Sequence, residues 1–209
     1  MTGSATRALS RSLLDLCRMR KLKIATAESC TGGLVAAALT EIPGSSDVID
    51  RGFVTYSNTA KHAMLGVEKE ILDTFGAVSK ETATAMAFGA LEHADVDLAV
   101  AITGIAGPGG ATPGKPVGLV HLAVASRDGR IVHKECRFGA VGRSNVRQQS
   151  VVEALKMLME MARGPQPPLK KRPPAAGHRL RPRASRTPRR IDGKRRRTSR
   201  PSAPRVSDS

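Results

Sequence analysis

The chain has 209 residues and a formal net charge of +16, from 34 Lys and Arg against 18 Asp and Glu. Residues 163–209 hold 16 of these basic and only 2 of these acidic residues, so residues 1–162 carry a net charge of only +2. The apolar runs, such as 34–39 and 98–102, are far too short to cross a bilayer. The totals therefore exclude a transmembrane helix and predict one near-neutral domain over 1–162 with a basic appendage over 163–209.

The cysteines favour a reducing compartment. Cys17, Cys30 and Cys136 form no metal-spaced cluster and leave one thiol over in any pairing, so we expect a cytoplasmic protein with free thiols. The scattered arginines and serines of the first twenty residues also fit an organellar transit peptide. An apolar helical face through residues 9, 13, 16 and 17 instead favours a core helix that runs into a strand.

The hydrophobic periodicity predicts helices that alternate with strands. In chain order we expect a helix over 5–20, a buried strand over 22–27, a helix over 34–42, a strand over 48–56, helical segments over 61–65 and 69–75, and a helix capped by Ser79. A buried strand over 96–103 then enters a glycine-rich loop over 104–118. The hairpin signal Asp128-Gly129 separates strands over 119–126 and 130–137, and a helix over 143–162 closes the body. This alternation predicts an α/β fold, a three-layer α/β/α sandwich with a mixed sheet.

The appendage over 163–209 has a different composition. It contains nine of the thirteen prolines and few apolar residues, so it cannot bury enough surface to offset its ordering entropy. We expect a disordered basic tail, whose arginine-rich runs could bind nucleic acid nonspecifically. Aromatic residues make up only 2% of the chain, which leaves almost no platform for base stacking. A translated wrong frame without a selected role is an equally open interpretation.

The segment 23–39 carries the most informative pattern. An apolar strand breaks at Ser29, passes Gly32 and Gly33, and resumes with helical spacing. A helix start offers unpaired N–H groups and a positive dipole, which suit an oxyanion or a phosphate. The pattern predicts Ser29 as a nucleophile, although a serine before a helix is commonly an N-cap. Thr31 could take that capping role instead.

Two features of this segment limit the prediction. The G-x-S-x-G pattern of a hydrolase nucleophile elbow is missing. Cys30 is a rival nucleophile, because a helix start lowers the pKa of a thiol. The interpretation that we favour makes Cys30 a small core residue.

A serine nucleophile needs a base nearby. Lys61, at the end of the segment 55–61, is a better candidate than His62, for which no carboxylate is obviously placed as a partner. A buried lysine can lose its charge and accept the hydroxyl proton. Tyr56, the only tyrosine of the chain, could relay or donate a proton. The alternative is that Lys61 is a solvated surface residue.

The loop over 104–118 is predicted to line a ligand site, together with Thr103 at its start. Residues 109–115 match G-x-x-x-x-G-K, but Pro116 replaces the required Ser or Thr and a strand follows. We therefore reject a mononucleotide fingerprint. Arg143 and Arg147 lie four residues apart on one helical face, where they either clamp a phosphate or are merely solvated.

Several of these segments together resemble the CinA C-terminal domain family. The matching segments are 28–33 (ESCTGG), 52–61 (GFVTYSNTAK), 101–110 (AITGIAGPGG), 115–120 (KPVGLV) and 143–147 (RSNVR). The resemblance covers roughly residues 5–162 in order and without evident gaps. Residues 163–209 lie outside the family pattern.

The resemblance implies an activity similar to nicotinamide-nucleotide amidase, which hydrolyses nicotinamide mononucleotide to nicotinate mononucleotide and ammonia in pyridine-nucleotide recycling. It also implies an α/β/α sandwich that commonly self-associates and uses no metal or cofactor. Mapped onto this chain, it makes Ser29 the nucleophile, Lys61 the base and Tyr56 their partner. Larger CinA proteins carry an additional N-terminal pyrophosphatase domain, which the 209 residues do not include.

The remaining predicted site residues form the pocket around this group. Backbone N–H groups of residues 31–33 would hold the oxyanion, and the loop over 104–110 with Arg143 would grip the ribose phosphate. These residues are Thr31, Gly32, Gly33, Thr103, Gly104, Gly107, Gly109 and Arg143. Two alternatives to this function stay open, a noncatalytic nucleotide or nucleic-acid binder that acts through residues 163–209, and an amidase for a different amide metabolite.

Overall fold

The computed structural model describes residues 2–165. Of the disordered tail predicted over 163–209, residues 166–209 lie outside the described residues, and Arg163 ends the last helix instead of beginning the tail. Between residues 2 and 165, no helix combines the length and the apolar character that crossing a membrane requires.

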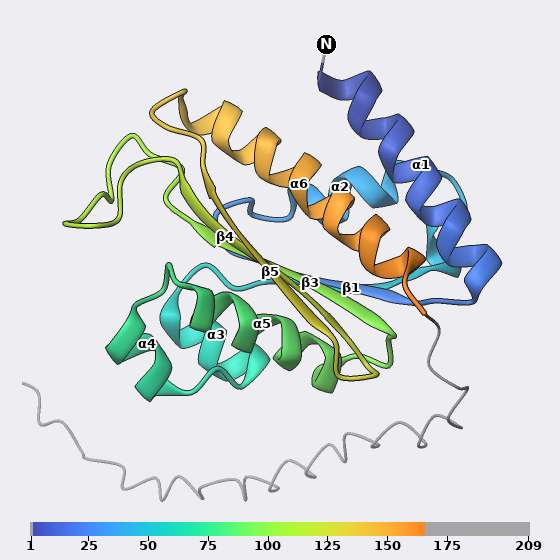
Figure 1. Cartoon of the computed structure of the whole chain (residues 1–209), viewed down its shortest axis with the longest axis horizontal. Coiled ribbons are helices and arrows are strands. Elements are labelled where there is room, and N and C mark those ends of the chain that lie inside the picture. Colours follow the sequence, from blue (N-terminus) through green and yellow to red (C-terminus); the bar gives the residue numbers. More distant parts are fainter. Residues whose placement is uncertain (1, 166–209) are drawn as a thin grey trace, which may run out of the picture. The chain divides into compact units, whose positions relative to one another are not determined.

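Helices and strands alternate along the chain in the predicted order (Figure 1). The helices are α1 (Thr2–Arg20), α2 (Leu34–Thr40), α3 (Asn58–Leu65), α4 (Lys69–Phe75), α5 (Lys80–His93) and α6 (Arg143–Arg163), with a short 3₁₀ turn at Ser45–Asp47. The strands are β1 (Ile24–Glu28), β2 (Ile49–Val54), β3 (Leu98–Gly104), β4 (Leu119–Ser126) and β5 (Ile131–Arg137).

Two helices begin three residues earlier than predicted, α1 at Thr2 rather than at residue 5 and α3 at Asn58 rather than at residue 61. Ser57 caps α3, since its hydroxyl accepts the Ala60 amide at 3.0 Å. The strand before it accordingly stops at Val54 instead of 56. The predicted cap at Ser79 is confirmed by its contact with the Thr82 amide at 3.1 Å.

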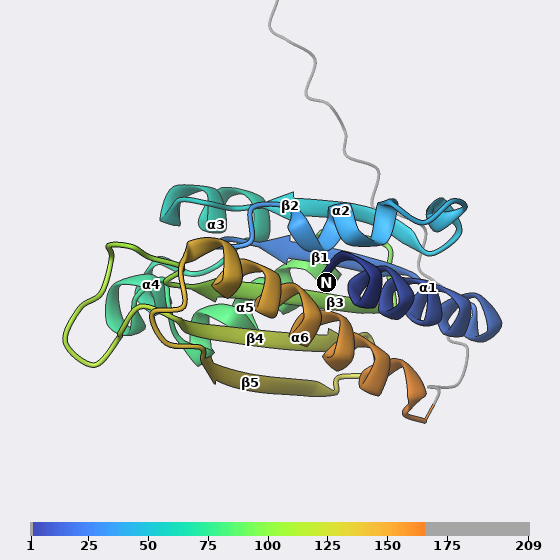
Figure 2. The same cartoon turned by 90° about the horizontal axis from the view of Figure 1, so that it is seen from above.

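The five strands form one mixed sheet in the order β2-β1-β3-β4-β5. β1 runs parallel to β2 and β3, whereas β4 is antiparallel to both β3 and β5. Helices α1, α2 and α6 cover one face of the sheet, and α3, α4 and α5 cover the other (Figures 1 and 2). The predicted three-layer α/β/α sandwich with a mixed sheet is confirmed.

The two faces of the sheet are packed with side chains of different size. Large aliphatic residues such as Ile24 and Ile102 face α1, α2 and α6. The opposite face of the central strands carries alanines at positions 25, 27, 99, 101, 123 and 125. These small side chains leave room for α5 to lie close to the sheet, and α5 itself presents alanines and a glycine.

Gly89 of α5 lies directly against the end of α3. A Cβ atom at this position would lie 1.9 Å from the carbonyl oxygen of Leu65, the last residue of α3. Because only glycine fits there, Gly89 determines how α3 rests on α5.

We predict that Gly89→Ala destabilises the protein, although alanine is the better helix former by about 1 kcal/mol. The overlap with the Leu65 carbonyl should lower the free energy of unfolding by a net 1 kcal/mol or more, on the order of other overpacked cores. Urea denaturation measures this change. Gly3→Ala is the matched control, since its Cβ would meet nothing within 4 Å; equal stability of the two variants would contradict the packing argument.

Candidate active site

Ser29 lies directly after β1, where the sheet still holds the backbone. Its amide donates to the Ile102 carbonyl of β3 at 2.9 Å, and the residue is 9% exposed. Because β1, β2 and β3 are parallel, the segments that follow these strands meet at the same edge of the sheet. This edge is the usual position of a ligand site in an open α/β sheet.

Lys61 of α3 contacts this serine. Its Nζ lies 3.0 Å from Ser29 Oγ and donates to the Thr55 carbonyl at 2.9 Å. Lys61 is only 1% exposed. The structure thus brings together two predicted site residues that are 32 positions apart in the chain.

The chemistry of this pair depends on the charge of the amine. Burial lowers the pKa of Lys61 below the 10.5 of an ordinary lysine, because a charged amine loses its hydration there. Within residues 2–165, no carboxylate forms an ion pair with Lys61 that would offset this loss. A neutral amine can accept the Ser29 proton through its lone pair while one N–H donates to Thr55. That arrangement is suited to a general base.

Cys30 has the opposite character. It is a buried member of the aliphatic core, and burial raises the pKa of its thiol to about 12. A thiol of this kind stays protonated at neutral pH and is a poor nucleophile. These properties favour the core role over the rival nucleophile.

Tyr56 and Arg143 form a bridge beside this pair. Arg143, the first residue of α6, donates to Tyr56 Oη at 2.7 Å and to the Gly107 carbonyl at 3.0 Å. Tyr56 follows Thr55 directly but is 60% exposed. Its hydroxyl has no hydrogen bond to Ser29 or Lys61 among the described residues, so Arg143 connects Tyr56 to the glycine-rich loop rather than to the serine.

The turn after Ser29 offers fewer amide donors than the sequence predicts. The Gly32 amide donates to the Ser29 carbonyl at 3.0 Å, and the Gly33 amide donates to the Glu28 side chain at 3.0 Å. Arg147 donates to the Thr31 carbonyl at 2.8 Å. Of the three predicted oxyanion residues, Thr31 is the one whose amide makes no hydrogen bond within residues 2–165.

The prediction that α2 begins with unpaired N–H groups beside Ser29 is wrong. α2 starts at Leu34, and the Glu28 carboxylate accepts the amides of its first turn. Thr31 does not cap the helix either, because its buried hydroxyl has no hydrogen-bond partner within the described chain.

The residues of the glycine-rich loop have different surroundings. Gly104 is packed against β4, where a Cβ would come within 2.8 Å of the Leu119 carbonyl. Gly107 precedes Pro108 in a cis peptide bond, whereas Gly109 has nothing within 4 Å of its Cβ position. The Thr103 hydroxyl donates to the Ala77 carbonyl at 2.6 Å. Gly104 therefore has a packing role, and the space at Gly109 would admit a ligand.

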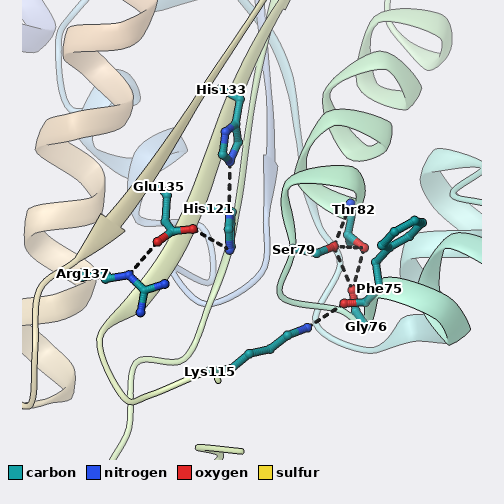
Figure 3. A network of polar contacts seen from close by, with 9 residues as sticks. All are labelled: Phe75, Gly76, Ser79, Thr82, Lys115, His121, His133, Glu135 and Arg137. Carbon is teal, nitrogen blue, oxygen red and sulfur yellow. Dashed lines mark hydrogen bonds and ion pairs between the residues drawn. The ribbon is translucent and has the colours of Figure 1, made fainter. Parts of the chain in front are cut away.

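Lys115 anchors this loop to the C-terminal end of α4, where its amine donates to the Phe75 carbonyl at 2.6 Å (Figure 3). The chain then enters β4, so the strand that argued against a P-loop is confirmed.

Figure 3 also shows a second network on β4 and β5, in which His121 Nδ1 lies 3.0 Å from His133 Nε2. It contains none of the predicted site residues. Among the residues described, no group of three or more His, Cys, Asp or Glu side chains is arranged to hold a metal ion.

Sequence reasoning missed the roles of Glu28, Thr55 and Ser57. A carboxylate just before a Gly-Gly helix start is a signal that could have identified Glu28 as a cap. Ser57 could have been recognised as the N-cap of a helix that contains Lys61. The Thr55 carbonyl gave no signal, because its contact with Lys61 depends on how α3 folds back over the sheet.

Comparison with known proteins assigns the domain. The family model described as CinA C-terminal domain matches residues 6–162. A crystal structure of the competence/damage inducible protein CihA from Agrobacterium tumefaciens is 54% identical and covers 75% of this chain and 94% of its own, with a TM-score of 0.74.

Two curated relatives differ in length. The CinA-like protein of Chlorobium phaeovibrioides is 54% identical over 121 residues, which are 58% of this chain but only 28% of that protein. The nicotinamide-nucleotide amidohydrolase PncC of Enterobacter agglomerans is 49% identical over 133 residues, which are 64% of this chain and 80% of that protein. The chain thus spans less than a third of the first relative's length and most of the second's.

Proposed function

The chain belongs to the CinA C-terminal domain family, and we propose that it is an amidohydrolase that converts nicotinamide mononucleotide to nicotinate mononucleotide and ammonia. The observation that carries the proposal is the buried 3.0 Å contact between Ser29 Oγ and Lys61 Nζ. The name of the Enterobacter relative supports the substrate.

The reaction proceeds through an ester of Ser29. Neutral Lys61 accepts the hydroxyl proton as Oγ attacks the carboxamide carbon of the substrate. The C–N bond then breaks, and the protonated Lys61 gives its proton to the departing ammonia, directly or through Tyr56, which leaves Lys61 neutral again. A water molecule, deprotonated by Lys61, cleaves the ester and regenerates Ser29. The route requires no metal ion or cofactor.

The developing negative charge on the carbonyl oxygen needs hydrogen-bond donors. The Thr31 amide supplies one, at a typical value of about 3–4 kcal/mol for a good donor. We assign the ribose phosphate to Arg143 and the loop at Gly107 and Gly109, because a guanidinium has five N–H groups and Arg143 uses two of its nitrogens within the protein.

We place this activity in the cytoplasm, since all three cysteines are free and buried. Self-association stays a prediction of the family resemblance. Nucleic-acid binding by the basic segment is the competing function, favoured by the net charge of +14 over residues 163–209. It requires salt-sensitive retention of DNA or RNA that is lost on deletion of residues 166–209, without ammonia release.

We predict that Ser29→Ala abolishes ammonia release from nicotinamide mononucleotide by the full chain, with a loss of at least about 10³-fold in kcat. Lys61→Met, which keeps an unbranched side chain one atom shorter and removes the base, should cost about 10²–10⁴-fold. Cys30→Ala is the matched control and should stay within a few-fold of the original rate. Loss in the cysteine variant with retention in the serine variant would transfer the chemistry to Cys30. Parallel assays with nicotinamide and nicotinamide riboside test whether another amide is the better substrate.

The pH dependence should follow Lys61. The protonated amine cannot accept the Ser29 proton, so kcat/KM should fall tenfold per pH unit below the Lys61 pKa and level off above it. Burial places this limb below pH 10.5. Between the lowered pKa of the folded state and the 10.5 of the unfolded state, Lys61 carries a proton in the unfolded chain but not in the folded one. The free energy of unfolding should therefore rise with pH over this range. A profile of kcat/KM without an acid-side limb anywhere below pH 10.5 would contradict Lys61 as the base.

A further inference from the structure

We propose that Glu28 is a positioning residue that holds Ser29 within reach of Lys61. The inference rests on the proposed function, because it assigns the placement of the same nucleophile. The Glu28 carboxylate does not touch the reacting atoms. The residue acts through the backbone segments to which it is hydrogen-bonded.

The Glu28 side chain organises the turn that follows Ser29. The residue is fully buried, and its two carboxylate oxygens accept three backbone amides, from Gly33 at 3.0 Å, Val35 at 3.1 Å and Ala36 at 2.9 Å. Gly33, the N-cap residue of α2, has no side chain that could cap the helix itself. One carboxylate thus closes the turn onto the start of α2 and balances the positive end of its dipole.

The Glu28 backbone holds the base as well. Its carbonyl accepts the Thr55 amide at 2.8 Å, and the Thr55 carbonyl in turn accepts a hydrogen bond from Lys61 Nζ at 2.9 Å. The next residue, Ser29, donates its amide to Ile102. Glu28 therefore joins the nucleophile turn and the anchor of the base at one point of the sheet.

The alternation of side chains along β1 gives the two neighbours separate tasks. Ile24 of β1 faces the layer of α1, α2 and α6, and Ala25 and Ala27 face the layer of α3, α4 and α5. Glu28 continues the first set and reaches α2, while Ser29 reaches Lys61 on the opposite side. A shift of the Glu28 cap would therefore be transmitted directly to the Ser29 side chain.

Glutamine cannot replace this carboxylate. Its NH₂ group would face at least one of the three amides, which would lose its acceptor in a buried environment. The turn would have to move to relieve this contact. A displacement of about 1 Å at a catalytic group can cost on the order of 10² in rate.

The test compares Glu28→Gln with the full chain in kcat, KM and melting temperature. We expect kcat to fall on the order of 10²-fold while KM for nicotinamide mononucleotide stays nearly constant. Glu41→Gln, an exposed carboxylate just after α2 that pairs with Arg7, is the matched control and should leave kcat unchanged. A lower melting temperature with unchanged kcat below that temperature would reduce Glu28 to a structural cap and overturn the inference.

Glu28→Asp serves if the glutamine variant does not fold at the assay temperature. It keeps the charge but withdraws it by one methylene, so kcat should still fall with KM retained; an unchanged kcat would overturn the inference.

Crystal structures separate this inference from the proposed function. If the original chain releases no ammonia, the proposed function fails, but the positioning role is still measured by the distance from Ser29 Oγ to Lys61 Nζ. The Glu28 variant should lengthen it from 3.0 Å to beyond about 3.5 Å, outside hydrogen-bond range. An unchanged distance would overturn the inference whatever the activity.

Discussion

The site depends on one buried hydrogen bond, between the hydroxyl of Ser29 and the amine of Lys61. Burying a lysine without a carboxylate partner is costly in free energy, and the protein reduces this cost by favouring the neutral amine. The same loss of charge makes the amine able to accept a proton. The burial of Lys61, which is unfavourable for its charged form, is therefore what enables the amine to act as a base toward Ser29.

The fold supports this contact from both sides of the sheet. On one side, the small side chains of α5 and the sheet allow α3, which carries Lys61, to approach closely, and Gly89 admits the Leu65 carbonyl. On the other side, α2 and α6 hold the nucleophile turn through Glu28 and Arg147. Arg143 then links the end of β2 to the glycine-rich loop. Each layer of the sandwich thus contributes a contact at the carboxyl edge of the parallel strands, where ligand sites of open α/β sheets commonly lie.

Local patterns in the sequence were sufficient to predict the order of the elements and the layered fold. The apolar runs around Ile24 and Val100 mark buried strands, and Asp128-Gly129 marks the hairpin. The choice of Ser29 and Lys61 also came from local chemistry, but their contact spans 32 positions and could not be read from spacing. The Glu28 cap was missed because it depends on three features together: the direction of the strand, the shape of the turn and the residue at which the helix begins. Because that cap takes the Gly33 amide and the Ser29 carbonyl takes the Gly32 amide, the predicted set of oxyanion donors was too large.

The most direct measurement is mass spectrometry of the full chain after rapid acid quenching of its reaction with nicotinamide mononucleotide. The account predicts a transient peptide containing Ser29 whose mass has increased by that of the substrate less ammonia, with no such increase in Ser29→Ala. Ammonia release with the added mass on Cys30, or with no covalent adduct and full activity in Ser29→Ala, would contradict it.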